Sequence, residues 1–158
     1  MSGPLPDLLP GYARRYVSAN GGCVDVHETH GKLELRQNLP VAVFLADRGE
    51  RVRLLPVSRE PGSKSADATR NGIEWGFKAP AGRTANAIDQ ALRGANRQAA
   101  YVLVAVPSDF DLRVLEQALF LRMRRAANLE GVAILRPDAL YEFTRREILD
   151  DTFRGKMG

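Results

Sequence analysis

The pair Asn71-Gly72 lies between two short extended segments and is the strongest constraint on how this chain folds. Asparagine and glycine adopt the positive φ angles that a two-residue hairpin turn requires. The turn predicts a β-hairpin in which Asp67 lies on the incoming strand and residues 73–78 form the outgoing strand. Side chains alternate along a strand, so one face of the outgoing strand is apolar, with Ile73, Trp75 and Phe77, and the other carries Glu74, Gly76 and Lys78. The hairpin therefore brings an acidic residue and a lysine to the same end of a small sheet.

The segments around the hairpin predict an alternation of strands and helices. Apolar residues at helical spacing predict a helix over residues 39–48 that stops at Gly49, with Pro40 in its first turn. Thr84 can cap a second helix that runs to about Asn96, and Ser108 or Asp109 begins a third that runs to about Ala127. Further helical segments are predicted at 12–17 and 140–149. Strands are predicted at 23–26, 51–57, 101–106 and 132–135.

The order of these elements predicts an α/β domain. From the helix at 39–48 onward it reads helix, three strands, helix, strand, helix, strand, and the last crossovers suit βαβ units. With 158 residues, 44% hydrophobic and 27% charged, the chain is long enough to bury a core as one globular domain. We therefore predict an arm or linker over residues 1–22, which are rich in proline and glycine, and a single α/β domain over residues 23–158.

Composition excludes several classes of protein. The chain has no run of about 18 apolar residues, and its start lacks the basic and apolar regions of a signal peptide, so we expect no membrane span and a cytoplasmic working compartment. The lone cysteine, Cys23, excludes an internal disulfide framework and a zinc site made only of cysteines.

The charge pattern permits nucleic-acid binding. The net charge is +4, and basic residues gather near two predicted strands. One group is Arg48, Arg51, Arg53 and Arg59, and the other, around the hairpin, is Lys64, Arg70, Lys78 and Arg83. Such residues can contact phosphates without reading a base sequence, although a solvated charged surface is an equally good interpretation.

The spacing from Asp67 to Gly76-Phe77-Lys78 resembles the PD-(D/E)XK nuclease signature. In that family an aspartate and a second acidic residue hold a divalent metal ion, and the lysine assists the attacking water or stabilises the developing charge. The chain departs from the pattern because Gly76 stands at the position of the second acid and Ala66 at that of the proline.

A longer stretch, roughly residues 24–136, resembles the tRNA-cleaving toxin domains of contact-dependent growth inhibition systems. The resemblance rests on residues 38–49, 52–56 and 95–99 and on Trp75-x-Phe77-Lys78. That family usually has an acidic residue just before the asparagine that matches Asn38, and here the position is Gln37. The resemblance implies a restriction-endonuclease-like αβββαβ core, a mixed central sheet flanked by helices.

The resemblance also implies a function and partners. It implies a metal-dependent nucleic-acid phosphodiesterase that acts on tRNA, with Mg²⁺ as the divalent cation. It further implies delivery within a larger toxin into a target cell's cytoplasm, and a cognate immunity protein.

In this interpretation Asp67 is the metal ligand and Lys78 the catalytic cation. Glu74 shares a strand face with Gly76 but lies about 6–7 Å along the strand, so it replaces the missing acid only if the metal shifts. With Gln37 and Gly76 both neutral, we expect weak magnesium binding. The residues predicted to contact the substrate backbone are Lys64, Arg70, Arg83, Arg97 and Gln98.

Several alternatives stay open at this stage. The chain is active through a rearranged acidic set that includes Glu34 or Glu74, or it is a degenerate relative that binds without cutting, or it is an inactivated toxin. A rival of another class is a non-catalytic nucleic-acid-binding or mobile-element accessory protein on the same fold. His27 and His30 have the spacing of a metal or acid/base pair, but without a third partner we predict polar loop histidines.

Overall fold

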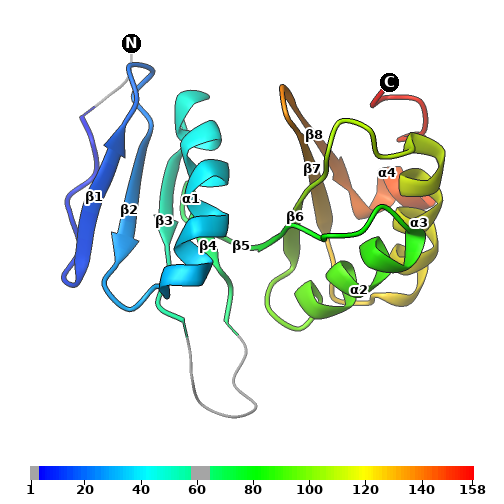
Figure 1. The fold of residues 1–158 in the computed structure, drawn as a ribbon, viewed down its shortest axis with the longest axis horizontal. Helices are drawn as coiled ribbons and strands as arrows, with labels where there is room; N and C mark the ends of the chain where they lie inside the picture. Colours follow the sequence, from blue (N-terminus) through cyan, green and yellow to red (C-terminus); the bar gives the residue numbers. More distant parts are fainter. Residues whose placement is uncertain (1–3, 58–64) are drawn as a thin grey trace. The chain divides into compact units, whose positions relative to one another are not determined.

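The computed structural model describes residues 4–57 and 65–158, and they form a mixed α/β structure (Figure 1). The strands pair in the order β1-β2-β3-β4-β5-β6-β7-β8, and helices flank the sheet, as predicted. The segment α1-β3-β4-β5-α2-β6 has the predicted αβββαβ order. The chain divides into two compact units, Met1–Trp75 and Gly76–Gly158. The elements of the first unit are β1 (Tyr12–Val17), β2 (Cys23–His27), α1 (Lys32–Asp47), β3 (Arg51–Leu54), β4 (Ala68–Arg70) and the first half of β5 (Ile73–Lys78).

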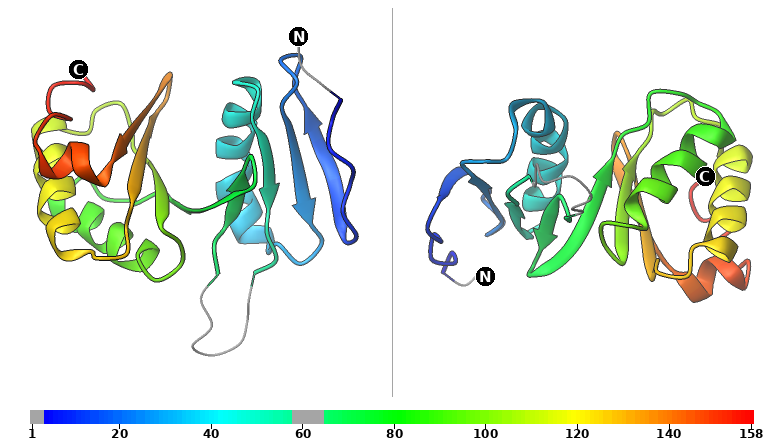
Figure 2. Two further views of the ribbon diagram at one scale, coloured as in Figure 1. Left: turned by 180° about the vertical axis from the view of Figure 1, so that it is seen from behind. Right: turned by 90° about the horizontal axis from the view of Figure 1, so that it is seen from below.

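In the first unit, α1 covers one face of the strands (Figures 1 and 2). β1 is antiparallel to β2, β2 is parallel to β3, and β3, β4 and β5 follow as antiparallel neighbours. The core forms where alternate strand residues meet the helix. Its strand residues include Val24, Val52, Leu54 and Ala68, and its helix residues include Val41, Ala42, Leu45 and Ala46, all buried.

The hairpin that the sequence predicts is confirmed. Asn71 and Gly72 have φ angles of 49° and 88°, and Ala68, Thr69 and Arg70 pair with Trp75, Glu74 and Ile73. A Cβ on Gly72 would meet no atom within 4 Å, so backbone conformation rather than space favours glycine there. Trp75 and Phe77 are buried as expected, but Ile73 is exposed because it directly follows the turn.

The second unit is built from βαβ crossovers. The end of β5 is parallel to β6 (Tyr101–Ala105), which is parallel to β7 (Gly131–Arg136), and β8 (Ala139–Thr144) is antiparallel to β7. The helices α2 (Ala85–Ala95), α3 (Leu112–Arg125) and α4 (Arg145–Leu149) lie on one face of β6–β8 (Figure 2). Their apolar sides close a core that includes Ile88, Leu92, Leu115, Leu119, Val102, Val104 and Ile134.

Four local predictions were wrong. Tyr12–Val17 is a strand rather than a helix, because its alternating residues pair with β2. α1 begins at Lys32, and Pro40 lies inside it at an exposed position where water can satisfy the carbonyl that loses its donor. α3 begins at Leu112 because Asp111 caps it, accepting hydrogen bonds from the N–H groups of Arg113 and Val114.

The fourth concerns residues 140–149, which form β8 followed by α4 rather than one helix. Thr144 and Glu147 make a capping box, with each side chain accepting a hydrogen bond from the other residue's backbone N–H, so the helix begins only after Thr144. No helix among the described residues has the length and apolar character needed to cross a membrane.

Candidate functional site

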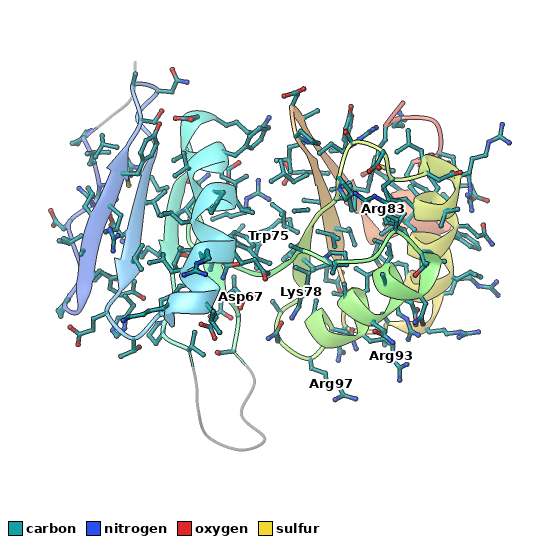
Figure 3. The ribbon with its side chains drawn as sticks, viewed as in Figure 1. Asp67, Trp75, Lys78, Arg83, Arg93 and Arg97 are labelled. Atoms are coloured by element: carbon teal, nitrogen blue, oxygen red, sulfur yellow. The ribbon has the colours of Figure 1, made fainter. Side chains whose placement is uncertain are left out.

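Asp67 lies in a bend just before β4, and its backbone is fixed on both sides. Its N–H donates to the Trp75 carbonyl at 3.0 Å, and its carbonyl accepts from the Leu55 N–H, also at 3.0 Å. The residue is half-buried, whereas Glu74 on the neighbouring strand is exposed. Both belong to the first unit, together with Trp75. Asp67 and Trp75 are labelled in Figure 3. The hairpin thus holds one carboxylate at a defined place between β3 and β5.

Lys78 ends β5 in the second unit, opposite Val104 of the parallel strand β6. It is half-buried and lies next to α2, where a Cβ added to Gly94 would be 3.7 Å from the Lys78 Nζ atom. Gly94 is in the last turn of α2, and the partial negative charge at a helix C-terminus favours an ammonium group. Asp67 and Lys78 belong to different units, so the expectation that they lie close together stays a prediction.

Gln37 and Gly76, at the two positions that are acidic in the nuclease family, cannot supply a charged ligand to a metal ion. Gly76 is buried and pairs with Val102, so it offers only backbone atoms. Gln37 is exposed on α1, and the buried residue beside it is Asn38. Within the described ranges no three His, Cys, Asp or Glu residues gather where they could hold a metal. At positions 37 and 76 the chain therefore offers no carboxylate to a metal ion.

Arg70, predicted to contact the substrate, is buried and makes an ion pair inside the first unit. Its Nε and Nη2 atoms donate to the two Glu50 carboxylate oxygens at 2.7 and 2.8 Å, and its guanidinium lies 4.4 Å from the centre of the Trp75 ring. Both side chains of the pair are mostly buried. This geometry makes Arg70 a structural link between β4 and the start of β3.

The other predicted substrate contacts lie in the second unit, except Lys64, which is outside the described residues. Arg83 donates to Asp109 at 2.8 Å, and this hydrogen bond lowers the pKa of the Asp109 carboxyl, although both side chains are exposed. Arg97 is exposed just beyond α2, and Figure 3 shows it with Arg93 projecting away from the helix. The Gln98 Oε1 atom is buried without a hydrogen-bond partner among the described residues. Arg83 and Arg97 are thus the exposed cations of this set among the described residues.

The two histidines have different environments, and they are not a pair of polar loop residues. His30 is buried, its Nδ1 donates to the Leu55 carbonyl at 2.6 Å, and its Nε2 lies 3.3 Å from the Asn38 amide nitrogen. His27 is the last residue of β2 and stacks edge-on against Tyr12. His30 thus connects α1 to the end of β3, a role that a polar spacing pattern does not reveal.

Sequence reasoning also missed a charged group on the sheet face away from α1. Asp25 is almost fully buried and accepts two hydrogen bonds from Arg14, at 2.8 and 3.0 Å. Alternation along β2 could have located it, since Asp25 interrupts an otherwise apolar strand.

No protein-family model and no curated protein matches the chain. Among solved structures, the chain is similar to a toxin and immunity complex, CdiA-CT/CdiI, from Burkholderia pseudomallei. The sequences are 18% identical, the TM-score is 0.49, and the match covers 72% of this chain and 89% of the other.

Arg70 and Arg48 both contact the Glu50 carboxylate, and we predict that replacing them lowers the free energy of unfolding by very different amounts. Arg70→Gln should lower the free energy of unfolding of the first unit by about 3 kcal/mol, because it leaves the largely buried Glu50 carboxylate with only the longer contact to the exposed Arg48. Arg48→Gln is the matched control: Arg48 lies 3.9 Å from Glu50 and is half exposed, so its loss should cost under about 1 kcal/mol. The fluorescence of Trp75, the only tryptophan, followed through urea unfolding measures both. An equal loss of unfolding free energy in the two variants would contradict the structural role given to Arg70.

Proposed function

We propose that this chain is a nucleic-acid-binding domain on a PD-(D/E)XK nuclease scaffold, with cleavage weakened by the loss of its second carboxylate. The observation that carries the proposal is the hairpin. Asp67 precedes β4, Lys78 ends β5, and a residue without a side chain occupies the position of the missing acid. The sequence keeps the aspartate and the lysine that such nucleases use and lacks the acidic residues at positions 37 and 76.

The chemistry follows from what each group can do at a phosphodiester. The Lys78 ammonium stabilises negative charge that develops on phosphate oxygens, and Asp67 accepts a proton or orients a water molecule. These two groups do not make up the acidic set of a magnesium nuclease. We therefore assign the chain binding and, at most, slow cleavage.

The partners follow from the resemblance to the toxin domains of contact-dependent growth inhibition. The substrate proposed on that basis is tRNA, which the domain would meet in the cytoplasm of a target cell after delivery in a larger toxin. A toxin of this kind is neutralised by an immunity protein that covers the site, and we propose such a partner here. The exposed Arg83 and Arg97 would contact the phosphate backbone.

A second candidate is a binding protein that does not cut, such as an accessory protein of a mobile element. The neutral pair Gln37 and Gly76 favours it, because two positions that are acidic in the nuclease family are uncharged. The two candidates share nucleic-acid binding and differ in whether catalysis can be restored.

Nucleic-acid binding should depend steeply on salt. Each phosphate contact releases counterions, so log K for tRNA should fall linearly with log salt concentration, with a slope of about −0.7 to −0.9 per contact. Arg97→Gln should make the slope less steep by about 1, whereas Arg113→Gln, an exposed residue at the start of α3, should not change it. Fluorescence anisotropy with labelled tRNA measures this. Absence of binding at low salt, or binding that salt leaves unchanged, would remove nucleic acid as a partner.

Restoring the missing acid should restore cleavage. Gly76→Glu places a carboxylate on the strand face of Lys78, and magnesium-dependent cleavage of tRNA should rise by about 100-fold or more. Gly76→Gln is the matched control, since it adds the same bulk without the charge. The gain should disappear in Gly76→Glu proteins that also carry Asp67→Ala or Lys78→Ala.

Two other results of this experiment are informative, provided that circular dichroism shows a folded variant. If the unmodified chain cuts at full rate and Gly76→Glu adds nothing, the acidic set has moved, and Glu74→Gln is the next variant to measure. If neither chain cuts RNA or DNA with any divalent metal, the binding protein without catalysis is the better account.

A further inference from the structure

A hollow of about 440 Å³ lies in the first unit, on the sheet face that α1 does not cover. Val52 and Leu54 of β3 are buried in the core that α1 closes, so the alternate residues Arg51 and Arg53 point to the opposite face. The residues that line the hollow include Pro6, Cys23, Asp25, Arg51, Arg53 and Thr69.

Two residues that line the hollow each have a polar atom without a hydrogen-bond partner in the described part of the chain. The Arg53 Nε and Thr69 Oγ1 atoms are both inaccessible to solvent and make no hydrogen bond to any described residue. The two residues face each other directly across the antiparallel strands β3 and β4. Buried polar groups are nearly always hydrogen-bonded, so two orphaned atoms on one cross-strand pair point to a missing partner.

The charge of the hollow is positive despite the buried aspartate. Asp25 is already bound by two hydrogen bonds from Arg14, and no ion pair joins Arg51 or Arg53 to a carboxylate among residues 4–57 and 65–158. Burial, and then Asp25, raise the pKa of the Cys23 thiol, so the sulfur adds no negative charge at neutral pH. The missing partner is therefore expected to be an anion.

The start of the described chain borders the hollow and fixes one of the arginines. Arg51 Nη2 donates to the Pro4 carbonyl and Arg14 Nη2 to the Pro6 carbonyl, both at 2.6 Å. A guanidinium carries five N–H groups, so Arg51 keeps donors for a ligand while its position is restrained. Pro6 and Cys23 add an apolar wall beside the cations.

We propose that this hollow binds the phosphate group of a nucleotide, either free or at the end of a nucleic-acid chain. Arg51 supplies charge-assisted hydrogen bonds to the phosphate oxygens, and the apolar wall packs against the nucleoside. The Arg53 and Thr69 side chains turn on binding, so that their Nε and Oγ1 atoms become accessible and reach the same oxygens. The volume lies within the usual range for small-ligand sites. The inference uses residues of the first unit alone and needs no cleavage by Asp67 and Lys78.

Isothermal titration calorimetry on the full chain tests the proposal with four probes: AMP, adenosine, inorganic phosphate and a short 5′-phosphorylated oligonucleotide. AMP should bind saturably and adenosine at least tenfold more weakly. Tight binding of the oligonucleotide with weak binding of AMP would support a chain end as the source of the phosphate. If inorganic phosphate binds as tightly as AMP, the hollow recognises the phosphate group and the nucleoside adds no affinity.

Substitutions then locate the site. Arg53→Met and Thr69→Val should weaken the binding of the best phosphate probe by at least tenfold and by about threefold, respectively. The matched control is Arg36→Met, which removes one positive charge from an exposed position on α1 and should leave the affinity unchanged. Thermal unfolding of each variant shows that the fold is kept, and if Arg53→Met does not fold, Arg51→Met serves in its place.

Two outcomes would overturn the proposal. One is the absence of saturable binding for all three phosphate probes at millimolar concentration. The other is equal affinity in Arg53→Met, Thr69→Val and the unmodified chain.

Discussion

Strand β5 takes part in two hydrogen-bonded ladders. Its first half, Ile73 to Trp75, pairs with β4, and its second half, Gly76 to Lys78, pairs with β6. The Asn71-Gly72 turn sets the register of the first ladder, because a hairpin with a two-residue turn leaves no freedom to slip. That register places Asp67 beside Trp75, and the same strand carries Lys78 into the second unit. The residues of the proposed site thus depend on one turn.

Gly76 shows that a strand keeps its structure at a position with no side chain. A strand needs only backbone N–H and carbonyl groups for its ladder, and Gly76 supplies both while pairing with Val102. A metal ion needs oxygen ligands with charge, and a glycine has none on a side chain. Folding therefore tolerates a glycine at a position where chemistry requires a carboxylate. The hairpin can therefore form whether or not the residues on it take part in catalysis.

The fold was predictable where local rules act, and the site was less so. The turn at Asn71-Gly72, the Thr84 cap and the apolar run of β6 each carry a strong local pattern, and all were confirmed. β1 was missed because its residues take their conformation from pairing with β2, a non-local contact. Arg70, His30 and Thr69 depend on partners that are distant in sequence, Glu50, Leu55 and Arg53, so no spacing rule could assign their environments.

The central claim is that Asp67 lacks the second carboxylate that a magnesium site requires. Calorimetric titration of the unmodified chain with Mg²⁺, compared with Asp67→Ala and Gly76→Glu, tests it most directly. The account predicts no saturable binding below the millimolar range in the unmodified chain, no change with Asp67→Ala, and a new saturable site in Gly76→Glu. A tight site in the unmodified chain that Asp67→Ala abolishes would contradict it.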